Sequence, residues 1–294
     1  MKDVRFTLRK IRKSPLSLVG IGLVSFYAVL AIIAPLIAVP TQRDPFMIPP
    51  SATSEFEPKA PNELHPFGTT TTQIDLYYGC IWGTRAAFRL GIIVIVGTLT
   101  VGLTLGLVAG FYGGIIDELI MRFTDIILAF PGLILVMALI IALAQRGIER
   151  IDAATLGILI VGWPGYTRLI RGEVLRVKTE DYVEAARASG ASDLRIVGKH
   201  ILPNAIYPVV IVASLDFGTI VLFFAALSFL GLGAPLRYSD WGQLIQNSTN
   251  WLQSGLKYWW TWLYPGLFIT LFCLGWNLLG DAVRDILDPL YRRK

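Results

Sequence analysis

The chain contains 294 residues, of which 54% are hydrophobic and only 16% are charged. An ordinary soluble domain carries roughly 25% charged residues, so this composition excludes a soluble globule and indicates a protein embedded in a lipid bilayer. The formal net charge is +5, but the basic residues lie beside apolar runs and form no separate hydrophilic stripe, so we expect no nucleic-acid partner.

The first element is an apolar run at residues 17–39, which follows a basic N-terminal tail at residues 1–16. The run is long enough to cross a bilayer and longer than the apolar core of a cleaved signal peptide, so we predict a retained first transmembrane helix. The next segment, residues 40–85, is rich in Pro, Thr and acidic residues and poor in Lys and Arg. The positive-inside rule therefore predicts that this segment is extracytoplasmic and that the N-terminus is cytoplasmic.

Further apolar segments follow in a five-helix core at residues 86–284. The predicted spans lie at residues 90–111, 131–144 (after an amphipathic lead-in at 115–129), 154–170, 206–232 and 262–279. We therefore predict an all-α membrane protein with about six transmembrane helices, located in the cell (plasma or inner) membrane. Alternation of the spans leaves an outer loop at residues 233–261 and a cytoplasmic C-terminal tail at residues 285–294, so both termini are expected in the cytoplasm.

Small and polar residues inside the predicted spans indicate close packing or function. The second span carries glycines at helical spacing, which favours close approach of a neighbouring helix; they are Gly97, Gly102, Gly106 and Gly110. Asp216 and Asn277 are the plainest polar residues in apolar surroundings, where unsatisfied polar groups are costly, and both are candidates for a translocation pathway. For Asp216 the alternative is a packing role, either with a helix dipole or with a neighbouring membrane subunit, and we favour that alternative.

The cytoplasmic loop at residues 171–204 has mixed charge and good helix formers, which predicts a folded helix-turn-helix rather than a linker. Residues 180–189 form the first predicted helix, and Gly190 suits the left-handed position that ends it. Ser192 offers an N-cap for a second helix that runs to His200. We expect Leu202-Pro203 to close this helix, because proline cannot continue helical hydrogen bonding.

The first helix of this loop has two readings. Its small side chains at Ala185, Ala186 and Ala188 would let it approach a partner surface closely, with Tyr182 and Val183 as larger anchors. The same composition equally suits a helix that packs on its own chain.

A family resemblance enters at these residues. Glu184-Ala185-Ala186, Gly190 and Leu202-Pro203 resemble the EAA signature of ABC importer permeases, and 200–204 resembles its dipeptide/oligopeptide/nickel branch. Other matching motifs are Arg122-Phe123-Thr124-Asp125, Phe130-Pro131-Gly132, Leu227-Ser228-Phe229-Leu230-Gly231, Trp241-Gly242, Pro265-Gly266 and Asn277-Leu278-Leu279-Gly280-Asp281. Together they are similar to the C-type permease of that branch. At residues 70–79 the chain departs from the family pattern, with Thr70-Thr71-Thr72-Gln73-Ile74 in place of an acidic residue and Gly-Arg-Asp.

The resemblance implies a partner set: a homologous second permease, two ATPase subunits that hold ATP and Mg²⁺, and an extracytoplasmic solute-binding protein. It also implies no cofactor on this chain and an ATPase-coupling interface formed by Tyr182, Val183, Glu184, Ala185, Ala186, Ser189 and Gly190. The implied cargo is short peptides; import of oligosaccharides or nickel by the same architecture is the alternative.

Resident catalysis is not expected. Gly198-Lys199-His200 lacks the phosphate-loop spacing, and no GxSxG nucleophile turn is present. Two histidines are too few for a metal cluster, and Cys80 and Cys273 have no CxxC spacing. An ion-coupled secondary transporter is the alternative from another class, but it would often show inverted repeats, and none is visible. A membrane-anchored enzyme would need a catalytic constellation or a soluble domain.

Overall fold

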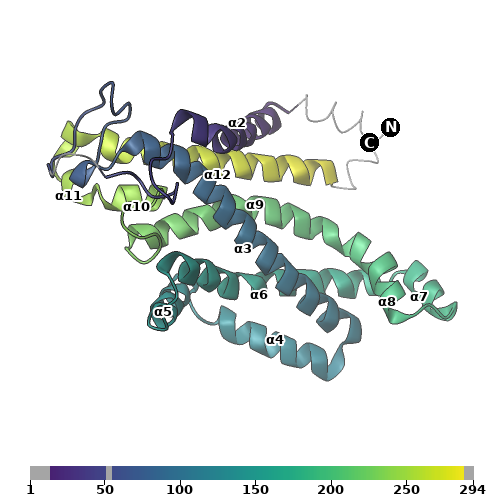
Figure 1. Cartoon of the computed structure of the whole chain (residues 1–294). Coiled ribbons are helices and arrows are strands. Elements are labelled where there is room, and N and C mark those ends of the chain that lie inside the picture. Colours follow the sequence, from purple (N-terminus) through teal and green to yellow (C-terminus); the bar gives the residue numbers. More distant parts are fainter. Residues whose placement is uncertain (1–13, 51–54, 288–294) are drawn as a thin grey trace.

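The computed structural model describes residues 14–50 and 55–287, and this part of the chain is almost entirely helical (Figure 1). The helices are α2 (Pro15–Ile37), α3 (Leu76–Tyr112), α4 (Gly114–Leu128), α5 (Gly132–Ala144), α6 (Arg150–Lys178), α7 (Asp181–Ala188), α8 (Asp193–Ile196), α9 (Leu202–Phe229), α10 (Trp241–Gln246), α11 (Thr249–Leu252) and α12 (Trp260–Leu287). The long helices run between an end that carries α7 and α8 and an opposite end that carries α10 and α11 (Figure 1). Most of the predicted basic N-terminal tail and most of the predicted C-terminal tail lie outside the described residues.

The prediction of about six spans is confirmed, with one span broken. Five helical stretches of the described chain are long and apolar enough to cross a membrane: Pro15–Ile37, Leu76–Tyr112, Arg150–Lys178, Asp193–Phe229 and Trp260–Ile286. The sixth candidate is the pair α4 and α5, which meet at 89°. Pro131 stands at the N-cap of α5 and disfavours a helical conformation in the residue before it, so the chain turns there. The 13 residues of α5 are too few to cross a bilayer alone.

Helix α3 begins at Leu76, well before the span start expected at residue 90. Asp75 caps the helix, its side chain accepting a hydrogen bond from the backbone N–H of Tyr78 at 3.0 Å. Arg85 and Arg89 interrupt the apolar pattern of the sequence, but both lie on the exposed side of the helix while the other side is buried. The last ten residues of the predicted 40–85 segment are therefore helix and not loop.

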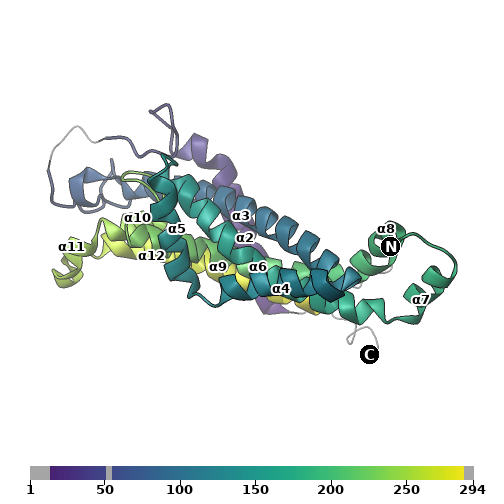
Figure 2. The same ribbon diagram turned by 90° about the horizontal axis from the view of Figure 1, so that it is seen from below.

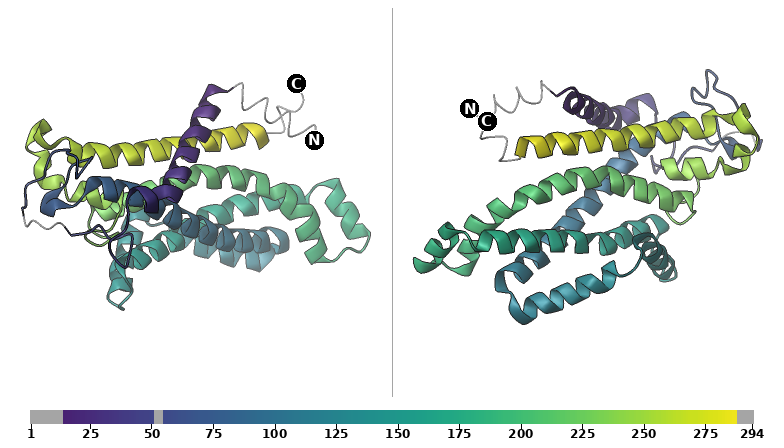
Figure 3. Two further views of the ribbon diagram at one scale, coloured as in Figure 1. Left: turned by 45° about the horizontal axis from the view of Figure 1, so that its top comes forward. Right: turned by 180° about the vertical axis from the view of Figure 1, so that it is seen from behind.

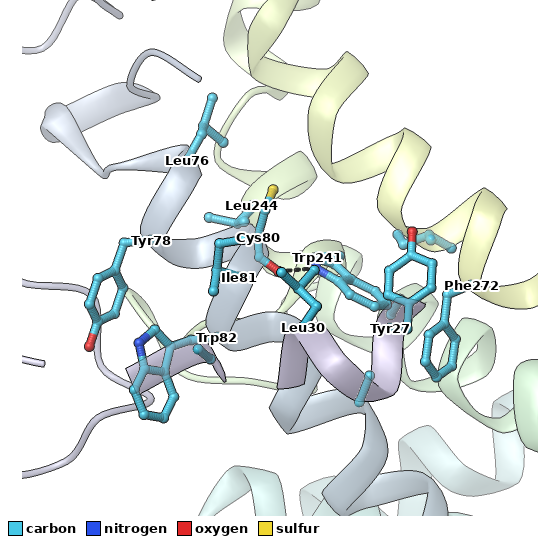
Figure 4. Close-up of a cluster of buried hydrophobic side chains, with 14 of the residues drawn as sticks. Tyr27, Leu30, Leu76, Tyr78, Cys80, Ile81, Trp82, Trp241, Leu244 and Phe272 are labelled. Atoms are coloured by element: carbon cyan, nitrogen blue, oxygen red, sulfur yellow. Dashed lines mark hydrogen bonds between the residues drawn. The ribbon is translucent and has the colours of Figure 1, made fainter. Parts of the chain in front are cut away.

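An aromatic core joins α2, α3, α10 and α12 near the α10–α11 end (Figure 4). Trp241 at the start of α10 is 2% exposed, and its indole N–H donates to the carbonyl of Cys80 at 3.1 Å. Tyr27 of α2 lies edge-on to Phe272 of α12, with ring centroids 5.3 Å apart, and its hydroxyl donates to the carbonyl of Phe268 at 3.0 Å. These contacts fix α2 across α12, a crossing visible in Figure 3 as the purple helix over the yellow one.

Glycines allow α3 to lie directly against α6, as the spacing in the sequence predicts. A Cβ atom on Gly102 would lie 2.5 Å from the Cβ of Tyr166, and one on Gly106 would lie 2.8 Å from the carbonyl oxygen of Thr167. Such distances leave no room for a side chain at either position. The backbones of α3 and α6 can therefore approach each other closely at these glycines.

Residues 70–75 of the divergent 70–79 segment form a tight turn that is tied to the α10–α12 region, and its last four residues begin α3. Thr72 and Gln73 both have φ of 56°, a left-handed conformation that non-glycine residues rarely adopt. The Thr71 hydroxyl donates to the carbonyl of Asn247 at 2.8 Å and accepts from the indole N–H of Trp251, also at 2.8 Å. The residues that depart from the family pattern are therefore hydrogen-bonded into the surface at the α10–α11 end of the chain.

Asp240 at this same end provides a pH-dependent contribution to stability. Its carboxylate accepts a hydrogen bond from the backbone N–H of Gln243 at 2.9 Å and caps α10, while burial raises the pKa of its carboxyl to about 6. Since the unfolded pKa is lower, the native state holds a proton that the unfolded chain releases. The stabilisation is therefore complete below about pH 4 and is lost as the pH rises to about 6.

We expect the substitution Asp240→Asn to remove this pH dependence, because asparagine keeps the capping oxygen and cannot ionise. Near pH 7 the variant should melt a few degrees higher than the parent, and near pH 4 the two melting temperatures should converge. Thermal melting of the purified chain at both pH values measures the difference. A constant offset at both pH values would contradict the assignment.

Candidate functional site in the helical hairpin

The predicted cytoplasmic loop folds into a hairpin, defined here as residues 180–201, that projects from one end of the bundle (Figure 2). Helix α7 ends at Ala188, and Gly190 follows it in the expected left-handed conformation, with φ of +78°. The backbone N–H of Ala191 donates to the carbonyl of Ala186 at 3.1 Å and so satisfies one of the last helical carbonyls. Glycine is favoured here because its missing Cβ removes the steric cost of the left-handed conformation.

The second half of the hairpin differs from its prediction. Helix α8 is four residues long, and Ser192 occupies its N-cap without a hydrogen bond from its side chain. A π-helical turn, Val197–Ile201, follows and leads directly into α9, with Pro203 in the first turn of that helix. The expectation that Leu202-Pro203 closes the helix is therefore wrong. Pro203 lies in the first turn of α9, where a missing N–H costs that helix no hydrogen bond, so the chain continues from the hairpin into a span.

Val183 attaches the hairpin to its own bundle. The side chain is 1% exposed and lies in a cluster with Val177 of α6 and with Ile196 and Ile201. Of the two large residues expected to anchor a partner, Tyr182 is 42% exposed while Val183 faces inward. The two readings of this helix thus apply to different faces of it, one packed on the chain and one open.

The open face borders a concave notch with a volume of about 480 Å³. Small residues of α7 and its turn form one wall, and basic residues form the other; the lining is Tyr182, Ala185, Ala186, Ser189, Gly190, Ala191, Arg195, Lys199 and His200. Five of the seven residues assigned to the coupling interface therefore come together here. Glu184 is exposed on another face of α7. The notch can accept a protruding side chain, and its basic wall favours an acidic one.

Ion pairs between α4 and α6 are a feature that sequence reasoning missed. Arg171 donates to both carboxylate oxygens of Asp117, at 2.5 Å from Nε and 2.6 Å from Nη2, and Arg168 donates to Asp125 at 2.5 Å. In the sequence these arginines stand where the predicted span at residues 154–170 meets the loop at 171–204, and the positive-inside rule reads them only as an indication of the cytoplasmic side. A useful signal was present, since Asp117 and Asp125 are eight residues apart and so lie near one face of the amphipathic α4.

The two intramembrane polar candidates lie on different helices and have different surroundings. Asp216 of α9 accepts a hydrogen bond from the hydroxyl of Tyr166 on α6 at 2.7 Å. This bond joins α6 and α9 within the chain, and Tyr166 is a partner that neither of the two interpretations of Asp216 had named. Asn277 of α12 is exposed on the isolated chain. The structure therefore does not bring the two residues into one polar site.

The described residues contain no group of three His, Cys, Asp or Glu side chains able to hold a metal ion. His65 and Asp75 form a pair, with 2.7 Å between Nδ1 and Oδ2, at the start of α3. Cys80 and Cys273 are both free thiols.

Long apolar helices, internally paired charges and a hairpin at one end define this chain as an α-helical multi-pass membrane protein. Residues 102–293 match the family described as binding-protein-dependent transport system inner membrane component. The chain belongs to that family: it is a permease subunit of a binding-protein-dependent ABC importer and not an enzyme. Permeases of this class work together with other permease, ATPase and binding-protein components.

Similar proteins match almost the whole chain. The dipeptide transport system permease protein DppC of Alkalihalophilus pseudofirmus is 37% identical over 289 residues, covering 97% of this chain and 89% of that protein. The probable D,D-dipeptide transport system permease protein DdpC of Escherichia coli K12 is 36% identical over 292 residues, covering 98% and 93%. A chain of the MetNI methionine ABC transporter in an inward-facing conformation shares the fold, with a TM-score of 0.56, 20% identity, and coverage of 71% of this chain and 96% of that one.

Proposed function

We propose that this permease imports short peptides and forms half of the translocation pathway together with a homologous second permease. The observation that carries the proposal is 31–37% identity, over nearly the whole chain, to permeases named for dipeptide and oligopeptide transport. Two ATPase subunits supply the energy and hold ATP and Mg²⁺, and an extracytoplasmic solute-binding protein delivers the peptide. The chain itself binds no cofactor.

The proposed orientation places the hairpin end in the cytoplasm and the α10–α11 end outside the cell membrane, with both termini cytoplasmic. Supporting it is the distribution of charge: the basic tail at residues 1–16 precedes α2, and the hairpin carries Arg187, Arg195 and Lys199. The acid-rich, Lys- and Arg-poor segment around residues 55–75 lies at the opposite end.

The hairpin is proposed as the element on which the ATPase docks and through which it moves the permease. An exposed tyrosine, small side chains and a basic notch suit the docking of a partner surface, while the buried Val183 cluster and the continuous passage into α9 suit transmission of a movement into a span. Nucleotide-driven closure of the ATPases would then move α7 and α9 together and switch the access of the cavity.

Reconstitution tests the proposal. The complete transporter is placed in proteoliposomes with its ATPase subunits and ATP inside the vesicle and its solute-binding protein outside. These vesicles should accumulate a labelled dipeptide. Uptake should stop when ATP is replaced by a non-hydrolysable analogue. Accumulation of an oligosaccharide or nickel with no peptide uptake would overturn the substrate, and ATP-independent uptake driven by an ion gradient would overturn the class of mechanism.

A further inference from the structure

A second cavity, of about 690 Å³, lies near the α10–α11 end and is separate from the hairpin notch. The cavity is bounded by α3, α6, α9 and the 235–240 loop. Leu90, Val221 and Phe224 form apolar walls, and Tyr238 and Asp240 lie at the loop side. Its mixed lining, apolar within and polar at the loop and rim, is typical of a site for a small organic ligand.

The charges around this cavity are unbalanced. Four acidic residues line it, Asp44, Glu149, Asp152 and Asp240, against one arginine, Arg89. Arg89 lies over the ring of Phe46, with 5.5 Å from its guanidinium carbon to the ring centroid. None of the four carboxylates is within ion-pair distance of a basic group in residues 14–50 or 55–287. The cavity thus carries a negative excess that a cation could neutralise.

Tyr238 provides an independent indication of a ligand. Its side chain is 6% exposed and stacks on Phe46, with centroids 5.6 Å apart. Its hydroxyl forms no hydrogen bond with the described residues and is accessible from the cavity that Tyr238 lines. Asp44, Arg89, Asp152 and Asp240 line the same cavity as Tyr238. A ligand atom in the cavity would satisfy the Tyr238 hydroxyl.

The distribution of the acidic residues distinguishes a metal ion from an organic cation. A divalent metal needs several oxygen ligands within about 2.6 Å, and no three acidic or histidine side chains of the described chain converge in that way. Carboxylates dispersed around an apolar space suit instead a single positive charge on an apolar body. A primary ammonium group has three donors, which could be shared between the Tyr238 hydroxyl and rim carboxylates.

We propose that this cavity binds a primary ammonium group carried on an apolar body. In the peptide importer proposed above, on which this assignment of the natural ligand rests, the group is the free amino end of the peptide. The cavity would hold the peptide by its amino end at the α10–α11 end of the permease, and blocking the amine would abolish recognition there.

Binding of two matched probes tests the inference. Phenylalanine amide carries the ammonium group and an apolar body, and N-acetylphenylalanine amide lacks the charge. Saturation-transfer NMR with the full chain in lipid nanodiscs should show binding of the amine, with the acetylated probe at least about tenfold weaker. The double variant Asp44→Asn and Asp152→Asn should weaken amine binding by about tenfold or more, because it removes two rim charges while preserving side-chain shape.

Two further variants separate the site from a general charge effect. Tyr238→Phe removes a hydroxyl that makes no internal hydrogen bond, so the chain should fold normally and bind the amine several-fold more weakly. Glu63→Gln removes a carboxylate outside the cavity and should leave binding unchanged. Equal binding of the two probes, or parental affinity in the double variant, would overturn the inference.

The same preparations distinguish failure of this inference from failure of the proposed function. ATP-dependent dipeptide uptake by the complete transporter without amine-selective binding to the chain would overturn the cavity assignment and leave the function intact. Selective amine binding without peptide uptake in the reconstituted transporter would overturn the assignment of a peptide as the natural ligand and retain the ammonium site.

Discussion

ATP-driven uptake is expected to fall on the order of 100-fold in the variant Ala185→Arg, because the arginine fills the notch that we propose as the ATPase docking surface. Ala185 is exposed on the isolated chain, so the substitution does not disturb the buried Val183 cluster. The loss should appear as failure of partner docking and not as failure of folding. Peptide uptake by the reconstituted transporter and co-purification of the ATPase with the permease measure the two effects.

The matched control for this variant is Ala188→Arg. It makes the same substitution three residues further along the same helix, at an exposed position that does not line the notch. Its uptake should remain within a few-fold of the parent. If both variants lose uptake equally, the effect belongs to added charge on α7; if Ala185→Arg transports normally, the notch is not the docking surface.

The variant Gly242→Ala is expected to destabilise the α10–α11 end by about 3 kcal/mol or more. Any Cβ at position 242 would lie 1.9 Å from the carbonyl oxygen of Ala225 in α9, a backbone atom that cannot rotate away. Relief requires α10 to move off α9, which would displace the neighbouring Trp241 from the aromatic core shown in Figure 4. Thermal melting and size-exclusion chromatography of the purified chain should show a lower melting temperature and a larger aggregated fraction.

Gly266→Ala is the control for this prediction. Gly266 lies inside α12, and a Cβ there would have no neighbour within 4 Å. Because alanine is the better helix former, the control should be stabilised slightly, by up to about 1 kcal/mol. Equal melting temperatures for the parent and Gly242→Ala would show that α10 does not pack on α9 as described.

Much of the hairpin could be predicted because its signals are local. Gly190 ends α7 through its own backbone freedom, and the residues around it form helix through their own propensities. The behaviour of Pro203 could not be predicted in the same way. Proline interrupts hydrogen bonding in a helix interior, but here Pro203 follows a π turn and stands in the first turn of α9, where its N–H is not needed.

The hairpin notch could be predicted from the sequence better than the second cavity, because its signals are also local. Small residues at helical spacing indicate an open face, so most of the notch residues follow from the sequence. The second cavity does not, because Asp44, Arg89, Asp152 and Tyr238 come from four segments that local patterning cannot relate. In the sequence Val183 resembles an exposed anchor, and only its burial in a cluster with Val177, Ile196 and Ile201 shows that it faces the bundle.

The sequence by itself determined the membrane class, the approximate positions of the spans and the glycine face of α3. These follow from the length of apolar runs and from helical periodicity, which act within one segment. The tertiary structure alone decided the start of α3, the break between α4 and α5, and the pairing of Arg168 and Arg171 with acids 43 and 54 residues away. A charged residue in a sequence indicates exposure to water. In the folded chain the same residue can be paired with an opposite charge, and only the tertiary structure determines which residue that partner is.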